Sequence, residues 1–366
     1  MPSLRREMIT DAAVFDDEQL PRRLLHREAA VDQLSRAWES ALHSDQAHNV
    51  LIYGPSGVGK TALARHTLQR LTQHADIYSA HVESLGESMA GVVRSILHDL
   101  PGSDPATNTP REDLCIELRE HVNQPTIVIL DEADDLPATD VLDRMADVDG
   151  LSFVAICHDR EKWLSQVDSQ LRRRLFLKDL ALDRFSVNEL ADVLEARARR
   201  GLPSGVVTRG QLETIADDVA GVARKGIQAL RQAALLAEER DHSEIRSDDV
   251  DDSYERAQRD ILQKNLESLP FHHQLLYELI RVGGGLRAEE LHDRYERVAD
   301  DVYRGRGLTP ISKRARRMKL SKLESYELIS IYGKNRSTKY SPVDCLVSPD
   351  MSLQKLLNIN QNQTSL

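Results

Sequence analysis

Eight consecutive residues, 54–61, have the composition of a loop that binds phosphate groups. They read Gly-Pro-Ser-Gly-Val-Gly-Lys-Thr, which matches a glycine, four variable residues, then glycine, lysine and a hydroxyl residue. Such glycines let successive backbone N–H groups converge on phosphate oxygens, and the start of the following helix adds partial positive charge. Lys60 would reach the outer phosphates of a nucleotide, and the Thr61 hydroxyl would be a ligand of Mg²⁺.

Two acidic residues supply the second half of this chemistry. Residues 125–130 are apolar, predict a buried strand, and run into Asp131 and Glu132. Asp131 would hold Mg²⁺ directly or through water, and Glu132 would polarise the water that attacks the last phosphate. An apolar strand that ends in an acidic turn is common by itself. Together with residues 54–61 it predicts a nucleoside triphosphatase.

Strand and helix patterns alternate in the first half of the chain. Short apolar runs predict strands at 49–53, 77–82, 125–130 and 151–157, and helical spacing lies between them. This alternation predicts a parallel sheet with helices on both faces. Beyond residue 182 the patterns are helical only, at 187–200, 209–219, 226–239 and 247–269. We therefore expect an α/β core in residues 1–182 and an all-α domain in residues 183–262.

Residues 263–346 have the outline of a winged helix, and a polar tail of residues 347–366 follows. Helical patterns at 271–281, 288–302 and 311–325 precede short strands at 328–332 and 339–343. Thr309 and Pro310 are expected to be the N-cap and the first helical residue of the third helix. Around that helix the spacing puts Ile311, Ala315 and Met318 on an apolar stripe. Lys313, Arg314, Arg317 and Ser321 fall on another side, and Arg316, Lys319 and Lys322 flank the stripe.

The charge of the chain is unevenly distributed. The 366 residues carry a net charge of −11, yet residues 302–340 contain eleven Lys and Arg against two acidic residues. Such asymmetry points to an anionic partner for the basic segment. A basic helix suits the major groove of DNA, so we expect DNA contacts from Lys313, Arg314 and Arg317, and from Lys334 and Arg336 at the wing tip. The alternative is a solubilising basic face.

Composition argues against a membrane or secreted protein. No apolar run approaches the roughly 20 residues that cross a bilayer, and the polar N-terminus has no signal-peptide core. The three cysteines are far apart and form no metal-binding spacing. We expect a cytoplasmic protein with reduced cysteines, associated with the nucleoid.

Several motifs together resemble one family. Residues 15–28 look like the N-terminal segment of archaeal origin-recognition initiators, the Orc/Cdc-type AAA+ proteins, and residues 221–231 look like their second sensor helix. Their two nucleotide motifs match residues 54–61 and 130–134. The resemblance covers residues 14–345 and includes the C-terminal winged helix. The Arg-rich, acidic composition is compatible with a haloarchaeal paralogue.

The resemblance implies an AAA+ core that binds ATP or ADP with Mg²⁺, a helical lid, and a winged helix that grips duplex origin DNA. A replicative helicase and other initiator subunits are further possible partners. Phe185 stands where the family usually has Tyr at the lid start, and Arg197 and Arg224 match lid arginines that contact nucleotide. The expected nucleotide-binding residues are Gly54, Pro55, Ser56, Gly57, Val58, Gly59, Lys60, Thr61, Ala62, Phe185, Arg197 and Arg224, and the expected catalytic residues are Lys60, Asp131, Glu132, His158 and Arg224.

Two positions depart from the family pattern. His158 stands at the end of the fourth strand, where a polar Asn usually serves as first sensor; a neutral His can donate one hydrogen bond there. A solvated His at a strand end is the alternative. Gln170 stands where family members often have an Arg that serves a neighbouring subunit, and Arg172 could replace it.

Both departures bear on hydrolysis rather than on nucleotide binding. The leading hypothesis is an ATP-controlled replication initiator with slow ATPase activity. The rivals are a nucleotide-binding, DNA-binding regulator that hardly hydrolyses ATP, and a signalling NTPase whose winged helix is only structural.

Overall fold

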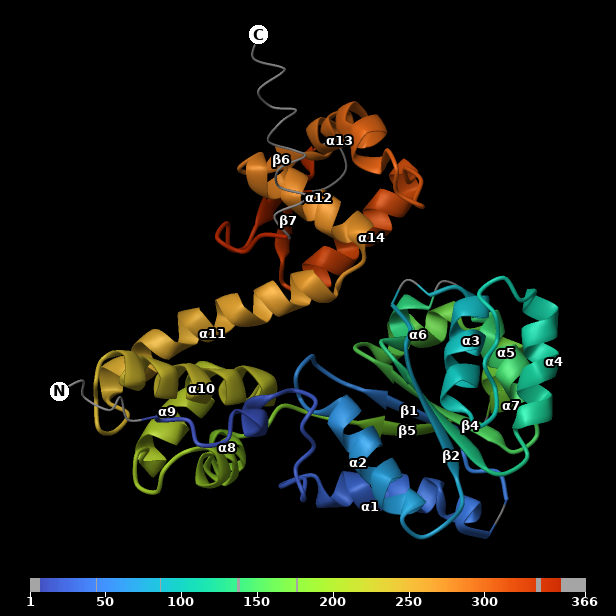
Figure 1. The fold of residues 1–366 in the computed structure, drawn as a ribbon, viewed down its shortest axis with the longest axis horizontal. Helices are drawn as coiled ribbons and strands as arrows, with labels where there is room; N and C mark the ends of the chain where they lie inside the picture. Colours follow the sequence, from blue (N-terminus) through green and yellow to red (C-terminus); the bar gives the residue numbers. More distant parts are fainter. Residues whose placement is uncertain are drawn as a thin grey trace. The chain divides into compact units, whose positions relative to one another are not determined.

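The computed structural model describes residues 7–43, 45–85, 87–136, 139–175, 177–333 and 337–349. The chain forms two compact units that divide between Asp252 and Ser253 (Figure 1). This division lies ten residues before the predicted end of the helical domain at 262. The predicted boundaries at 182 and 262 stay predictions.

A five-stranded parallel sheet forms the core of the first unit, as the alternating pattern predicted. Its strands are β1 (Val50–Tyr53), β2 (Tyr78–Glu83), β3 (Thr126–Asp131), β4 (Leu151–Cys157) and β5 (Lys178–Ala181), in the order β2-β3-β4-β1-β5. The sequence did not predict β5, because this edge strand has a single buried residue, Leu180, and so has no apolar run.

Helices cover both faces of the sheet (Figure 1). One face packs against α1 (Glu28–Ala37) and α2 (Lys60–Thr72). The opposite face packs against α3 (Met89–Asp99), α4 (Arg111–His121), α5 (Asp140–Ala146), α6 (Arg160–Gln166) and α7 (Ser169–Leu175). Strand residues alternate between these two apolar cores, so that Ile52 faces the first and Leu51 the second. Because the strands are buried on both faces, they appear in the sequence as continuous apolar runs.

The helical lid follows β5 and confirms the all-α region. It consists of α8 (Val187–Gly201), α9 (Arg209–Asp218), α10 (Ala223–Glu239) and the beginning of α11 (Ser247–Ser268). Capping boxes start α8, with Ser186 and Glu189, and α9, with Thr208 and Gln211. Each box satisfies backbone N–H groups that have no partner inside the helix.

The N-terminal lead-in segment, residues 7–27, is bonded to the lid over its first half. It contains a short 3₁₀ turn, η1 (Ala12–Phe15). The N–H of Thr10 donates to the carbonyl of Gly201 at 2.9 Å, and the Gln228 amide donates to the carbonyl of Phe15 at 2.8 Å. A Cβ on Gly201 would lie 2.5 Å from the Phe15 ring, so only glycine permits this approach.

The second unit has the element order of a winged helix. It contains α12 (Phe271–Val282), β6 (Leu286–Arg287), α13 (Ala288–Tyr303), α14 (Lys313–Ser325), β7 (Ile329–Tyr332) and β8 (Lys339–Pro342). The three strands pair antiparallel in the order β6-β8-β7. Three helices and a terminal hairpin fit the predicted outline, and β6 was not predicted because it has only two residues.

Two predictions for α14 were wrong. The helix begins at Lys313, and its N-cap is Ser312, whose hydroxyl accepts the N–H of Ala315 at 3.3 Å. Thr309 and Pro310 therefore precede the helix, because a side chain that can cap lies closer to its first turn.

The predicted apolar stripe also differs from the observed buried face. The Met318 side chain is 63 % exposed, whereas Arg316 is 1 % exposed. Arg316 is buried because its guanidinium stacks 4.2 Å from the Tyr295 ring centroid and donates to Glu296 at 2.6 Å. Lys322 is buried beside the Tyr326 ring in the same way. Arginine and lysine side chains that were expected to flank the apolar stripe thus lie on the buried face of the helix.

None of the described helices is long and apolar enough to cross a membrane. The cysteines Cys115, Cys157 and Cys345 are all free, as expected.

Candidate nucleotide-binding site

The loop of residues 54–59 connects β1 to α2 and has a backbone that requires glycine. Gly54 has φ 144°, and a Cβ there would lie 2.0 Å from the carbonyl oxygen of Leu182. Gly57 has φ 73°, and a Cβ there would lie 2.7 Å from a methyl group of Val222. These clashes explain the glycines physically, since a side chain would push the loop away from Leu182, which follows β5, and from Val222 of the lid. α2 begins at Lys60, so the first N–H groups of the helix have no acceptor within it.

The Lys60 ammonium lies inside this loop. It donates to the carbonyl oxygens of Gly54 and Pro55, at 2.8 Å each, and the residue is only 7 % exposed. Burial lowers the pKa of Lys60, and the neighbouring carboxylates of Asp131 and Asp134 oppose that shift. A buried cation next to two acidic groups is a suitable partner for phosphate oxygens.

Thr61 and Asp131 meet at the other end of the loop. The Thr61 hydroxyl donates to the Asp131 carboxylate at 2.7 Å. Burial raises the pKa of Asp131, but the nearby imidazole of His81 and the hydrogen bond from Thr61 outweigh it, so the pKa is lowered overall. A hydroxyl and an ionised carboxylate at this distance form the oxygen ligand set that Mg²⁺ prefers.

His81 was not among the predicted site residues. Its Nε2 lies 3.6 Å from the Asp131 carboxylate. The register explains the approach: Glu83 pairs with Asp131 in the sheet, and His81 lies two residues earlier on the neighbouring strand. The pairing of β2 with β3 would have revealed this neighbour, but the sequence alone gives no strand order.

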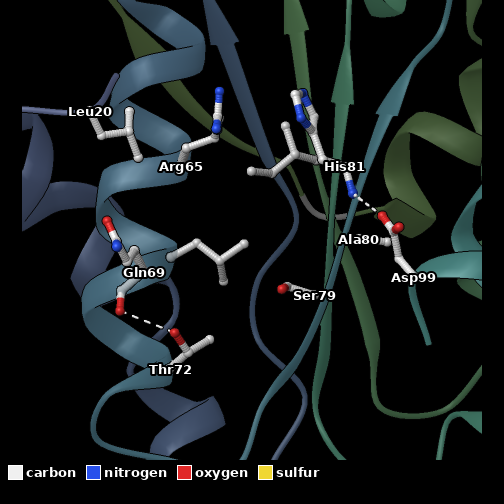
Figure 2. A pocket seen from close by; sticks show the side chains of 10 residues that line it. Leu20, Arg65, Gln69, Thr72, Ser79, Ala80, His81 and Asp99 are labelled. Carbon is white, nitrogen blue, oxygen red and sulfur yellow. Dashed lines mark hydrogen bonds between the residues drawn. The ribbon is translucent and has the colours of Figure 1, made fainter. Parts of the chain in front are cut away.

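A pocket of about 380 Å³ lies between α2 and β2, with His81 in its lining (Figure 2). Figure 2 shows Arg65, from α2, and His81, from β2, pointing toward the same end of the pocket. On the side of His81 that faces away from Arg65, the Asp99 carboxylate accepts the backbone N–H of His81 at 2.9 Å. His81, which lines this pocket, is also the residue that lies 3.6 Å from the Asp131 carboxylate.

Glu132 and His158 lie close to the same site. Glu132 has φ 51°, an unusual left-handed conformation for a side chain other than glycine, and its N–H donates to Asp131 at 3.0 Å. His158 follows β4, and its Nδ1 lies 3.2 Å from the Asp134 carboxylate. Asp134 comes just after the β3 motif, so His158 lies within the acidic end of the site and is not simply solvated. The catalytic roles of Glu132 and His158 stay predictions.

The lid contacts the loop through the first turn of α10. The N–H of Arg224 donates to the carbonyl of Gly57 at 3.1 Å. The Arg224 guanidinium is 2.8 Å from the Asp17 carboxylate of the lead-in segment. The predicted sensor is thus adjacent to the loop.

Phe185 and Arg27 form a second link between lid and loop. The Arg27 guanidinium stacks 3.7 Å from the Phe185 ring centroid and donates to the carbonyls of Asp183 at 2.6 Å and Val58 at 3.4 Å. Arg27 was not predicted as a site residue, because its neighbours come from three distant parts of the sequence. The stack uses only the face of the ring, which explains why an aromatic residue without a hydroxyl group is sufficient at position 185.

Arg197 lies away from these contacts, against the lead-in segment. Its guanidinium donates to the carbonyl of Val14 at 2.5 Å and to that of Gln19 at 3.4 Å, and the residue is 9 % exposed. Its predicted contact with nucleotide stays a prediction. Gln170 and Arg172 are both exposed on α7.

The predicted DNA-binding residues of α14 share one exposed face. Lys313, Arg314, Arg317, Met318 and Ser321 are all exposed, whereas Leu320 and Leu323 are buried. Lys334 and Arg336, predicted at the wing tip, lie outside the described residues.

The residues present fit a magnesium nucleotide. The loop of residues 54–59 has glycines with positive φ at 54, 57 and 59, Lys60 offers a buried cation, and Thr61 and Asp131 offer metal ligands. The parallel sheet, this loop and the lid define an AAA+ ATPase. Residues 23–156 match the AAA ATPase domain family, and residues 191–255 match the Cdc6 AAA+ ATPase-type lid domain.

Relatives specify the family further. The chain is 32 % identical over 342 residues to ORC1-type DNA replication protein 9 of Halobacterium salinarum, covering 92 % of this chain and 94 % of the relative. It is 29 % identical over 306 residues to ORC1-type DNA replication protein 1 of the same organism, covering 80 % and 97 %. The chain therefore belongs to the ORC1-type family of archaeal AAA+ replication initiators, as the resemblance in its sequence indicated.

Solved structures agree on the fold. Aeropyrum pernix ORC1 in complex with DNA has a TM-score of 0.75 at 23 % identity, covering 97 % of this chain and 98 % of that chain. Aeropyrum pernix ORC2, in ADPNP–ADP complexes, has a TM-score of 0.62 at 23 % identity, covering 98 % and 100 %.

Proposed function

We propose that this protein is an ATP-dependent initiator of DNA replication. It binds duplex origin DNA through its C-terminal unit and uses ATP binding, followed by slow hydrolysis, as a switch. The observation that carries the proposal is the hydrogen bond from the Arg224 N–H to the carbonyl of Gly57. Because a lid residue is bonded to the phosphate-binding loop, a change in the loop on nucleotide binding would be passed to the lid.

The roles of the chain's own residues follow from their positions. Residues 54–62 would hold the phosphates with backbone N–H groups, and Lys60 would exchange the carbonyls of Gly54 and Pro55 for phosphate oxygens. Thr61 and Asp131 would hold Mg²⁺, which neutralises phosphate charge when bound. Glu132 would orient the attacking water. Arg224 would contact the outer phosphate, so that the position of the lid would depend on whether that phosphate is present.

Slow hydrolysis is the expected consequence of His158 and Gln170, the two residues that depart from the family pattern. His158 Nδ1 already bonds the Asp134 carboxylate, and a neutral imidazole has a single N–H, so the ring keeps no further donor for phosphate or water. Gln170 offers no positive charge where a neighbouring subunit's site would need one. Both leave the loop and Lys60 unchanged, so ATP binding would be retained while turnover is limited.

The basic face of α14 supports DNA as the partner of the second unit. Lys313, Arg314 and Arg317 are exposed together on a helix, and a helix fits the major groove. The fold of the whole chain is also that of Aeropyrum pernix ORC1, which was solved with DNA. Such a protein would act at the nucleoid in the cytoplasm, where a helicase and further initiator subunits are candidate partners.

Genome-wide mapping of bound DNA, combined with ATP turnover, tests this function. An initiator should give its strongest peaks at replication start sites and should hydrolyse ATP slowly in the presence of that DNA. Peaks at promoters only, with no detectable turnover, would instead identify a regulator. Absence of DNA binding at moderate salt would identify a signalling NTPase with a structural winged helix.

A further inference from the structure

One apolar side chain, Met318, is exposed on α14 beside the basic residues Arg314 and Arg317. Met318 is 63 % exposed, whereas the other described methionines, Met8, Met89 and Met145, are 0 %, 7 % and 0 % exposed. Exposing a large apolar side chain gains nothing for the stability of the unit. Several other large apolar side chains are exposed as well, but Met318 is the one that lies on α14 next to exposed arginines, where a partner would contact it.

The neighbours of Met318 define what that partner must look like. On a helix, residues three and four positions apart are adjacent, so Arg314 lies on one side of Met318 and Ser321 on the other. Arg317 precedes it directly and is also exposed. A partner that covers this face must carry anionic groups opposite Arg314 and Arg317 and must offer an apolar group opposite Met318.

The major groove of DNA has this arrangement. Phosphates line both edges of the groove, and a helix that enters it meets base edges along its centre. The only apolar group displayed there is the C5 methyl of thymine, which side chains recognise by apolar contact. The unbranched thioether of methionine adapts to such a contact at little cost in geometry.

We propose that Met318 reads a thymine methyl group in the bound DNA site, so that the protein prefers a thymine at that position. This inference rests on the proposed DNA-binding function of the C-terminal unit. The cationic neighbours hold the helix on the phosphates, and Met318 adds sequence preference. Met318 is a specificity residue whose replacement should leave non-specific binding largely unchanged.

The test uses uracil, which pairs as thymine does and lacks only the methyl group. A duplex is first selected from a randomised pool by the full-length protein. Each thymine is then replaced singly by deoxyuridine, and the dissociation constant is measured by fluorescence anisotropy. Wild type should bind about fourfold more weakly at one thymine, the value expected for one buried methyl-sized group.

The variants decide which side chain reads the methyl group. Met318→Ala should bind the thymine and uracil duplexes equally, while Met318→Leu should retain the preference. Ser321→Ala, on the same exposed face, is the matched control and should also retain it. Because Met318 is largely exposed, its replacement should not unfold the unit, which circular dichroism checks.

Each result has a distinct meaning. A uracil penalty that persists in Met318→Ala overturns the inference, since another residue then reads the methyl group. A wild type that binds DNA with no uracil penalty at any position also overturns it while leaving the DNA-binding function intact. Failure of the wild type to enrich any duplex refutes the proposed function itself.

Discussion

Arg224 of the lid and Asp17 of the lead-in segment form an ion pair, with Arg224 Nε 2.8 Å from the Asp17 carboxylate. Both side chains are about one-third exposed, at 34 % and 38 %. Exposed pairs of this kind contribute about 0–1 kcal/mol. The ion pair with Asp17 therefore contributes little to holding the Arg224 side chain, and the Arg224 backbone is bonded separately to Gly57.

We predict that Arg224→Ala retains much of the nucleotide affinity but loses the response of the lid. The reason is that Arg224 lies on the lid, outside the loop that holds the phosphates. The measurement is the rate of limited proteolysis of residues 183–252 with ATP and with ADP. Arg200→Ala, an exposed lid position, is the control. A variant whose proteolysis still distinguishes ATP from ADP as wild type does would contradict the sensor role.

Lys60→Ala should abolish ATP binding. Among the described residues, Lys60 is the only one that places a cationic group inside the loop. Isothermal titration calorimetry with ATP and Mg²⁺ measures this directly. Lys162→Ala, which removes an exposed lysine of α6, should bind as wild type does. Micromolar affinity in a folded Lys60→Ala protein would show that the loop is not the phosphate site.

Glu132→Gln should keep the affinity for ATP and Mg²⁺ while hydrolysis stops. Only the carboxylate that polarises water is lost, and glutamine preserves the shape of the side chain. Phosphate release under single-turnover conditions is the readout, with Glu120→Gln on α4 as the control. Unchanged turnover would exclude Glu132 as the base, and a wild type without measurable turnover would favour the regulator.

The sequence predicted the nucleotide loop, the acidic strand end and the helical lid because each is a local pattern of a few consecutive residues. It could not predict that His81 approaches Asp131 or that Arg27 stacks on Phe185, since both contacts depend on strand order and chain path. The face of α14 was misjudged for a different reason. Arg316 is buried through a ring stack and an ion pair, which periodicity of apolar residues cannot reveal.

The stability of the second unit should depend on pH through His273. Burial lowers the pKa of His273 to about 3, and its Nδ1 has no hydrogen-bond partner among the described residues. The folded state thus favours the neutral ring, whereas the unfolded chain takes up a proton below the ordinary pKa of 6.5. The contribution is complete above pH 6.5 and is lost as the pH falls toward 3, by up to about 1.4 kcal/mol per pH unit.

His273→Leu should therefore flatten this dependence between pH 7 and pH 5. Leucine has a similar size, cannot be protonated and leaves no polar atom unpaired. Hydrogen exchange of peptides covering residues 271–282 measures the free energy of opening at each pH. His74→Leu, at an exposed position, should change nothing. An equally steep loss of protection in His273→Leu would show that another group titrates.

The salt dependence of DNA binding tests the central claim most directly. Binding of wild type and of the Lys313→Ala, Arg314→Ala, Arg317→Ala triple variant is measured over a range of salt concentrations, on a native origin duplex and on a scrambled one. Each lost phosphate contact should lower the log–log slope by about 0.9, and adding Lys334→Ala and Arg336→Ala should lower it further. A control variant lacking the exposed Arg70, Lys162 and Arg200 should keep the wild-type slope. An unchanged slope and affinity in the folded five-fold variant would contradict DNA binding through the C-terminal unit.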